Sequence, residues 1–199
     1  MQDMGENSID GKEIVRKSYE IVKKYVKGET AEEKVIQRCI IATGDPTVKD
    51  LIVFKGDAIK AGVEALKAGE NIICDVKMVE VGINKRKIRS KTYVAVEVGR
   101  DEKMTRAMSG MYRLKDKMDG AILAIGNAPS AAIAVYNLIR EGVKPSLVIA
   151  TPVGFVNAAE SKEMIRSLEV PSITTVGTRG GSAICVAIVN ALIDLCETL

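Results

Sequence analysis

Three short apolar runs between residues 120 and 182 constrain the fold of this chain more than any other feature. They read GAILAIGNAPSAA (120–132), LVIATPVGFVNAAESKE (147–163) and ITTVGTRGGSAICVA (173–187). Each run breaks into a turn of glycine, proline, asparagine or hydroxyl residues, and each turn leads into a helical pattern. This is typical of β-α units with buried parallel strands. Because ligands bind beyond the carboxyl ends of such strands, we expect the three turns to lie side by side and form the site.

The rest of the chain continues the alternation of strands and helices. Apolar runs predict further strands at 51–54, 71–74 and 93–98. Helical periodicity predicts helices at 10–27, 57–68, 102–111 and 181–198. Thr30-Ala31-Glu32-Glu33 has the form of a capping box, which predicts one more helix, ending at Thr43-Gly44-Asp45-Pro46. Five or six strands predict an α/β fold with a doubly wound, mostly parallel open sheet, and 199 residues suit one domain, 1–199.

Composition excludes several classes of protein. No apolar run approaches the ~20 residues that span a bilayer, and MQDMGENSID (1–10) has no signal-peptide core, which predicts a cytoplasmic protein without a membrane partner. The net charge of +3 is too small to indicate a nucleic-acid partner. One run, 84–91, is strongly basic; it is either a solvated surface or a means of attracting a polyanionic ligand.

Cysteine and histidine usage bears on metal and acid-base chemistry. Cys39, Cys74, Cys185 and Cys196 form no CxxC pair, so we interpret them as reduced thiols and predict no metal site. Histidine is absent from the whole sequence. Its absence removes the usual near-neutral acid-base group from any mechanism.

The glycine-containing turns admit more than one interpretation. The turns at 126–130 and 180–182 either serve βα geometry alone or present helix amino-terminal amides to an anion. A dinucleotide site is not indicated, since 177–181 has the wrong glycine spacing, and no P-loop sequence occurs. Asp75, at the end of a strand, is either catalytic or a cap for the next turn. Arg106 and Arg113 share a helix, where they are either solvated or suited to clamp a carboxylate.

Taken together, these residues resemble the precorrin-8X methylmutase family over nearly the whole chain. The most specific matches are 125–129 (IGNAP), 152–156 (PVGFV) with 159–162 (AESK), and 177–182 leading to 190–192 (NAL). Weaker matches lie at 17–19, 75–76, 78–79, 82–83 and 105–106.

The resemblance implies a function, a fold and a set of site residues. It implies an isomerase of cobalamin biosynthesis that moves a methyl group from C-11 to C-12 of a corrin precursor in a 1,5-sigmatropic shift, without a cofactor. It also implies a flavodoxin-like three-layer sandwich and a homodimer with the site near the subunit interface. The substrate is a flat, carboxylated tetrapyrrole, a precorrin or cobalt-precorrin. The substrate-binding residues so implied are Ser18, Arg38, Thr105, Arg106, Asn127, Ser130, Gly154, Arg179, Gly181 and Ser182.

One departure from the family concerns the catalytic acid. The family has a proton-donating histidine three residues after the arginine that matches Arg38, and here that position is Ile41. Asp45 and Asp75 are the candidate replacements, and either would need a raised pKa to hold a proton at neutral pH. The alternative function is therefore a non-catalytic binder or carrier of corrinoid intermediates. A third interpretation, another reaction on a related carboxylated ligand, has no feature in its favour. Ser130 stands where the family usually has threonine, and Thr178 where a basic residue is common.

Overall fold

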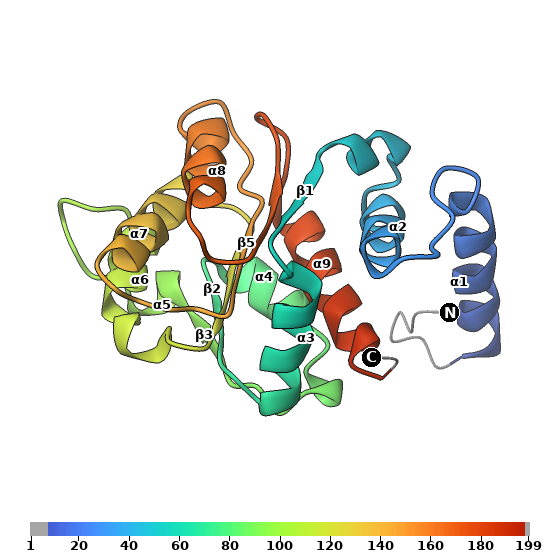
Figure 1. Ribbon diagram of the computed structural model, residues 1–199, viewed down its shortest axis with the longest axis horizontal. Coiled ribbons are helices and arrows are strands. Elements are labelled where there is room, and N and C mark those ends of the chain that lie inside the picture. Colours follow the sequence, from blue (N-terminus) through green and yellow to red (C-terminus); the bar gives the residue numbers. More distant parts are fainter. Residues whose placement is uncertain (1–7, 198–199) are drawn as a thin grey trace.

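A computed structural model describes residues 8–197, and a six-stranded sheet organises that part of the chain (Figure 1). The strand order is β1-β6-β5-β4-β2-β3. Every neighbouring pair is parallel except β1 and β6, which are antiparallel. The sheet is therefore mostly parallel, as predicted. The strands are β1 (Ile52–Lys55), β2 (Ile72–Cys74), β3 (Thr92–Val94), β4 (Ile122–Ile125), β5 (Leu147–Ala150) and β6 (Ser172–Thr175).

Helices cover both faces of the sheet and give three layers. Residues of α2, α3, α4 and α9 share one hydrophobic core with the sheet, and residues of α5, α6, α7 and α8 share the other. The helices are α1 (Ile9–Val22), α2 (Ala31–Thr43), α3 (Ala58–Ala68), α4 (Lys77–Gly82), α5 (Ala95–Val98), α6 (Arg106–Arg113), α7 (Pro129–Arg140), α8 (Ala158–Ser167) and α9 (Ser182–Leu195), with short 3-10 turns η1 (Pro46–Asp50), η2 (Lys85–Lys87) and η3 (Lys115–Lys117).

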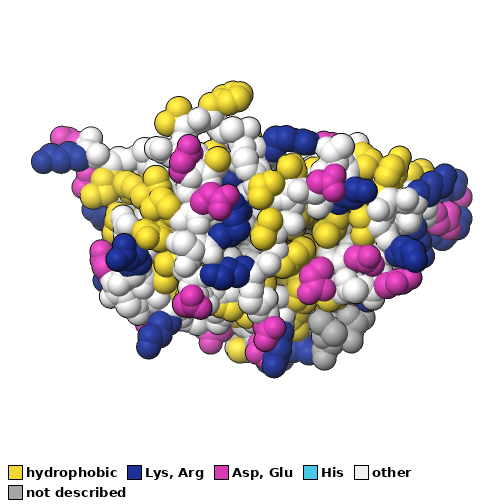
Figure 2. Space-filling view, turned by 45° about the horizontal axis from the view of Figure 1, so that its top comes forward, with side chains coloured by type: hydrophobic (Ala, Val, Ile, Leu, Met, Phe, Trp, Pro, Cys, Tyr) yellow, Lys and Arg dark blue, Asp and Glu magenta, His cyan; other side chains and the backbone are white. Residues whose placement is uncertain are grey.

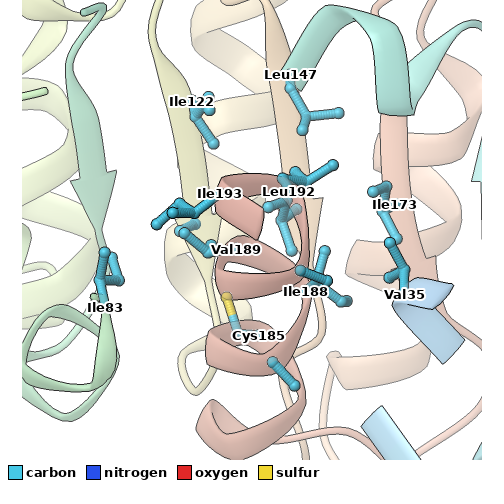
Figure 3. Packing of buried hydrophobic residues seen from close by; sticks show 14 of the residues in the cluster. Val35, Ile83, Ile122, Leu147, Ile173, Cys185, Ile188, Val189, Leu192 and Ile193 are labelled. Carbon is cyan, nitrogen blue, oxygen red and sulfur yellow. The ribbon is translucent and has the colours of Figure 1, made fainter. Parts of the chain in front are cut away.

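The central helix α9 explains why its sequence is apolar almost all round. Its side chains Ile188 and Leu192 lie among strand residues such as Leu147 and Ile173 on one face of the sheet (Figure 3). From the other side α9 is covered by α2, which contributes Val35 to the same core. Burying a side chain of this size contributes roughly 1.5–3 kcal/mol, so this core fixes the position of the amino terminus of α9.

Two predicted elements differ from the structure, one because of close backbone packing and the other because of a helix cap. The strand predicted at 93–98 ends at Val94, and Ala95–Val98 forms the short helix α5. A side chain at Gly110 of α6 would collide with the carbonyl oxygen of Ala95, so α6 approaches too closely for the strand to continue. The helix predicted at 102–111 begins at Arg106, because the Thr105 hydroxyl accepts a hydrogen bond from the amide of Met108 (3.2 Å) and caps it.

Other boundaries agree with the sequence to within a few residues. The capping box at Thr30 and Glu33 is formed, which confirms the start of α2. The first helix ends at Val22 rather than near residue 27. The last ends at Leu195, and residue 198 of its predicted range lies outside the described residues, as do residues 1–7 of the amino-terminal segment.

The basic run at 84–91 is engaged in part within the fold. Lys85 forms a salt bridge with Glu80, and the Nζ of Lys87 lies 3.4 Å from Asp194 and 3.0 Å from Glu197.

Three of the four cysteines are buried and Cys196 is partly exposed; all four are free thiols. Within residues 8–197, no helix has both the length and the apolar character needed to cross a membrane.

Candidate functional site

The three turns predicted to form one site meet at the carboxyl edge of the sheet. The amide of Gly181 donates to the carbonyl of Thr151 (2.6 Å), and the amide of Gly154 donates to the carbonyl of Thr178 (3.0 Å). These bonds join the β5–α8 turn to the β6–α9 turn. A Cβ on Gly126 would lie 2.8 Å from the Cα of Ser182, so the β4–α7 turn approaches the start of α9 equally closely. The prediction that these turns lie at one end of the sheet is confirmed.

The sheet topology has a switch point at this edge. The chain leaves β2 for α4 on one face of the sheet and leaves β4 for α7 on the other. Because β2 and β4 are neighbours, their following loops diverge, and such a switch point is where α/β folds bind ligands. Asp75 stands directly after β2 at this point.

Asp75 holds the turn that follows β4. It is 0% exposed. Its Oδ1 accepts from the amides of Val76 (2.9 Å) and Gly126 (3.0 Å), and its Oδ2 accepts from the amides of Asn127 and Ala128 (2.7 Å each). Burial raises the pKa of Asp75, and these four amides oppose that rise. Both oxygens are occupied as acceptors, which favours the capping interpretation of Asp75 over a proton donor.

Asp45 and Arg179 connect the end of α2 to the β6–α9 turn. The carboxylate of Asp45 accepts from the hydroxyl (2.7 Å) and the amide (2.8 Å) of Thr47, and it forms a salt bridge with Arg179. The hydrogen bond from the Thr47 hydroxyl is the largest cause that lowers the pKa of Asp45, with Arg179 acting in the same direction. Asp45 is therefore ionised at neutral pH and has no proton to donate.

Ile41 lies on the last turn of α2, four residues before Asp45, and is partly exposed. The end of α2 therefore places Ile41 close to the loop that contacts Arg179. Its side chain is apolar and has no ionisable group.

Thr105, Arg106 and Ser130 gather at the start of α6 and α7. The hydroxyl oxygens of Thr105 and Ser130 are 2.6 Å apart. The guanidinium of Arg106 donates to the carbonyl of Val96 (2.6 Å) and forms no salt bridge within residues 8–197. Asn127, on the neighbouring turn, is exposed. This group of hydroxyls, one exposed amide side chain and one uncompensated cation is suited to bind a carboxylate.

Two of the predicted substrate-binding residues are not brought to the turns. Arg38 is buried in a salt bridge with Asp194, which lies twelve residues beyond Ser182 along α9, or about 18 Å at the rise of an α-helix. Ser18 lies on α1, which packs on α2 at the far side of the molecule from the sheet (Figure 1). Its hydroxyl donates to the carbonyl of Ile14 (2.9 Å).

The β5–α8 turn exposes apolar side chains at the same edge. Val153 is 46% exposed, Phe155 94% and Val156 77%. Figure 2 turns the top of the molecule forward and shows hydrophobic side chains that project from it, with basic and acidic side chains below them. The edge therefore combines apolar surface with charges of both signs.

Lys162 lies beneath the β6–α9 turn; the sequence analysis included it in the 159–162 motif but did not name it as a site residue. It is 0% exposed, and its Nζ donates to the hydroxyl of Thr175 (3.1 Å) and the carbonyl of Arg179 (2.9 Å). Burial, with the charge of Arg166 acting in the same direction, lowers the pKa of Lys162 to about 8. The helical spacing of the sequence indicates that Lys162 is buried. Lys162 follows Ala158 by four residues and precedes Ile165 by three, so it lies in the buried stripe of α8.

Comparisons with known proteins agree with this geometry. A family model described as precorrin-8X methylmutase matches residues 13–195. The cobalt-precorrin-8 methylmutase of Methanocaldococcus jannaschii is 41% identical over 202 residues, which cover 96% of each chain. The cobalamin biosynthesis protein CbiHC of Archaeoglobus fulgidus is 48% identical over 191 residues; the match covers 96% of this chain but only 41% of that longer protein. Among solved structures, the precorrin-8X methylmutase of Thermus thermophilus superposes with a TM-score of 0.85 at 34% identity, covering 93% of this chain and 98% of that one.

Proposed function

The chain belongs to the precorrin-8X methylmutase family, and we propose that its three turns at the carboxyl edge bind a flat tetrapyrrole fringed with carboxylates. Membership makes it a methylmutase, an isomerase of cobalamin biosynthesis. The proposed reaction moves a ring methyl group from C-11 to C-12 of precorrin-8X or cobalt-precorrin-8. The observation that carries the substrate site is the convergence of three glycine-containing turns at one edge.

The chemistry of this edge suits such a ligand. At Gly177 and Gly181 an added Cβ would have no neighbour within 4 Å, which leaves room for a macrocycle, and the exposed apolar side chains at 153–156 offer surface to its ring face. The amino termini of α7 and α9 and the cation of Arg106 are receptors for the carboxylates. Arg179 can join them when a ligand carboxylate displaces Asp45.

Binding accounts for part of the proposed catalysis. The bond from the methyl carbon to C-11 breaks as the bond to C-12 forms, within one molecule. Holding the ring in one conformation therefore lowers the entropic cost of the shift. A general acid would add roughly 10²–10⁴-fold. With Ile41 apolar, Asp45 ionised and Asp75 occupied by amides, we propose that turnover is slow while binding is intact. The same observation favours a corrinoid-binding or carrier protein as the second candidate.

We also propose a homodimer, because Ser18 reaches the site only from a second copy. One exposed face of α1 presents Ile14 (65% exposed), Ser18, Ile21 (56%) and Tyr25, which follows the helix (48%). The spacing of four, three and four residues places these side chains on one stripe. Exposed apolar stripes of this kind mark interfaces. If the stripe packs over the partner's turns, Ser18 can meet the partner's ligand.

Sedimentation tests the dimer. A stable dimer is expected at micromolar concentration for the wild type, and Ile21→Lys is expected to dissociate it by burying an unpaired charge. Ser167→Lys, at the far end of α8, adds the same charge outside the stripe and should leave the dimer intact. A monomeric wild type would refute the proposal.

Titration with hydrogenobyrinate, followed by its visible absorbance, tests the substrate site. The wild type is expected to bind, and Arg106→Met should weaken binding about tenfold, the value of one charge-assisted hydrogen bond. Arg89→Met removes an exposed arginine that lies beside Gly69, before β2, and should change nothing. Absence of binding by the wild type, or equal losses in both variants, would contradict the assignment.

A further inference from the structure

Lys162 is a buried cation that is not ion-paired with a carboxylate in the described part of the chain. Its side chain is 0% exposed, and within residues 8–197 it makes no salt bridge. The charged groups that act on it are Arg166 and Glu163 on its own helix, and the turn above contacts it through the carbonyl of Arg179. Arg166 is already paired with Glu163 and donates to the carbonyl of Thr175 (3.2 Å). A buried ammonium is costly, so a fold that retains one without compensation has a use for it.

The contacts of Lys162 lie directly beneath the β6–α9 turn. The carbonyl of Arg179 accepts from the Nζ of Lys162 (2.9 Å) and from the hydroxyl of Thr175 (2.9 Å), while Lys162 also donates to that hydroxyl (3.1 Å). The ammonium therefore joins α8 to the last residue of β6 and to the turn. No other described side chain donates to the Arg179 carbonyl besides these two.

Fixing this carbonyl determines what the turn presents outward. The next residues are Gly180 and Gly181, and α9 begins at Ser182. The first intrahelical bond of α9 runs from the amide of Cys185 to the carbonyl of Gly181 (3.2 Å), so the amides of residues 182–184 have no acceptor within the helix. With the Arg179 carbonyl held inward, the start of α9 presents amide donors rather than an exposed carbonyl oxygen.

We propose that Lys162 is a positioning residue that holds the Arg179 carbonyl away from the site and places an uncompensated positive charge behind the 179–184 segment, so that this segment receives a carboxylate of the tetrapyrrole. The inference rests on the proposed function and deepens it. Lys162 does not touch the ligand; it acts through the turn. A ligand carboxylate bound at this segment supplies the negative charge that the fold itself leaves out.

The test compares Lys162→Met with Lys55→Met by titration with hydrogenobyrinate. Lys55 is a matched control, because its Nζ also donates to two backbone carbonyls, of Arg166 (2.7 Å) and Leu168 (2.5 Å), but at the other end of α8. Lys162→Met is expected to weaken binding by about tenfold or more, and Lys55→Met to leave it nearly unchanged. Equal affinity of Lys162→Met and wild type would overturn the inference while leaving the proposed function standing.

The pH profile of binding separates positioning by charge from a purely structural role. Wild-type affinity should fall as the pH rises through about 8, where Lys162 loses its proton, whereas the affinity of Lys162→Met should stay flat over the same range. If Lys162→Met does not fold, Lys162→Arg keeps the charge and should remove the same inflection while retaining binding. A wild-type profile without the inflection would overturn the inference, and a wild type that binds no tetrapyrrole would overturn it together with the proposed function.

Discussion

Replacing Asp75 by asparagine should destabilise the protein and release the β4–α7 turn. Asparagine keeps the volume of the side chain but has one acceptor oxygen, so its NH₂ group must face two of the four amides that now donate to Asp75. The buried amide of Gly126 will retain the oxygen. Asn127 and Ala128, which are exposed and partly exposed, will then lose their acceptor.

The magnitude follows from those two amides. A buried donor left without an acceptor costs about 1–3 kcal/mol, and partial access to water places these two toward the lower end. Relief of the buried charge offsets a part, so we expect the free energy of unfolding to fall by about 2–4 kcal/mol. Urea denaturation measures it. Asp57→Asn, at an exposed position without a capping hydrogen bond, should change it by less than about 0.5 kcal/mol. An Asp75→Asn variant as stable as Asp57→Asn would refute this account of the turn.

Two further predictions concern charges in the core. Arg38→Met removes the salt bridge of the buried Asp194 carboxylate, which then keeps Lys87 at 3.4 Å, so denaturation should show a loss of about 3–5 kcal/mol. Lys60→Met in a surface pair should cost less than about 1 kcal/mol. Salt bridges and hydrogen bonds from Lys85 and its neighbours lower the pKa of Glu80 to about 2. The stability that this carboxylate contributes is present above its ordinary pKa of 4.5 and is lost as the pH falls toward 2. Between pH 4.5 and 2, the free energy of unfolding of Glu80→Gln should therefore fall less than that of the wild type, by on the order of 1–2 kcal/mol. An equal fall in both proteins would contradict the contribution of Glu80.

The parts of the fold that could be predicted are those with a local physical signal. The capping box of α2 needs only Thr30 and Glu33, and it forms as written. The apolar runs of β4 and β5 predict burial on both faces, and both strands are fully buried. The glycine-containing turns that follow the predicted strands indicated that the site lies at the carboxyl edge of the sheet. This holds for any order of parallel strands, because their carboxyl ends lie at the same edge.

The parts that could not be predicted depend on contacts between distant residues. Nothing in the run at 93–98 indicates that Gly110, from another helix, will approach Ala95 and end the strand at Val94. The direction of β1 is set by its pairing with β6, which lies over a hundred residues away. Asp75 could be capping or catalytic until the amides of 126–128 were placed beside it.

The sequence shows which charged residues are present, but not which groups each of them contacts in the fold. Arg38 was predicted to bind a substrate carboxylate. It does bind a carboxylate, but that carboxylate is the side chain of Asp194 within the fold. Lysine is usually a surface residue, and only the position of Lys162 in the apolar stripe of α8 indicates that it is buried. Desolvation then gives it a lowered pKa, which no local pattern reveals.

Turnover of precorrin-8X by the wild type beside Ile41→His tests the central claim most directly. Conversion is followed as the absorbance of hydrogenobyrinate appears, and affinity is measured on the same samples. If the turns bind the macrocycle and no acid has replaced the histidine, both proteins should bind with similar affinity and Ile41→His should turn over faster, by up to roughly 10²–10⁴-fold. A wild type as fast as Ile41→His would contradict the claim that binding is intact and the acid is missing.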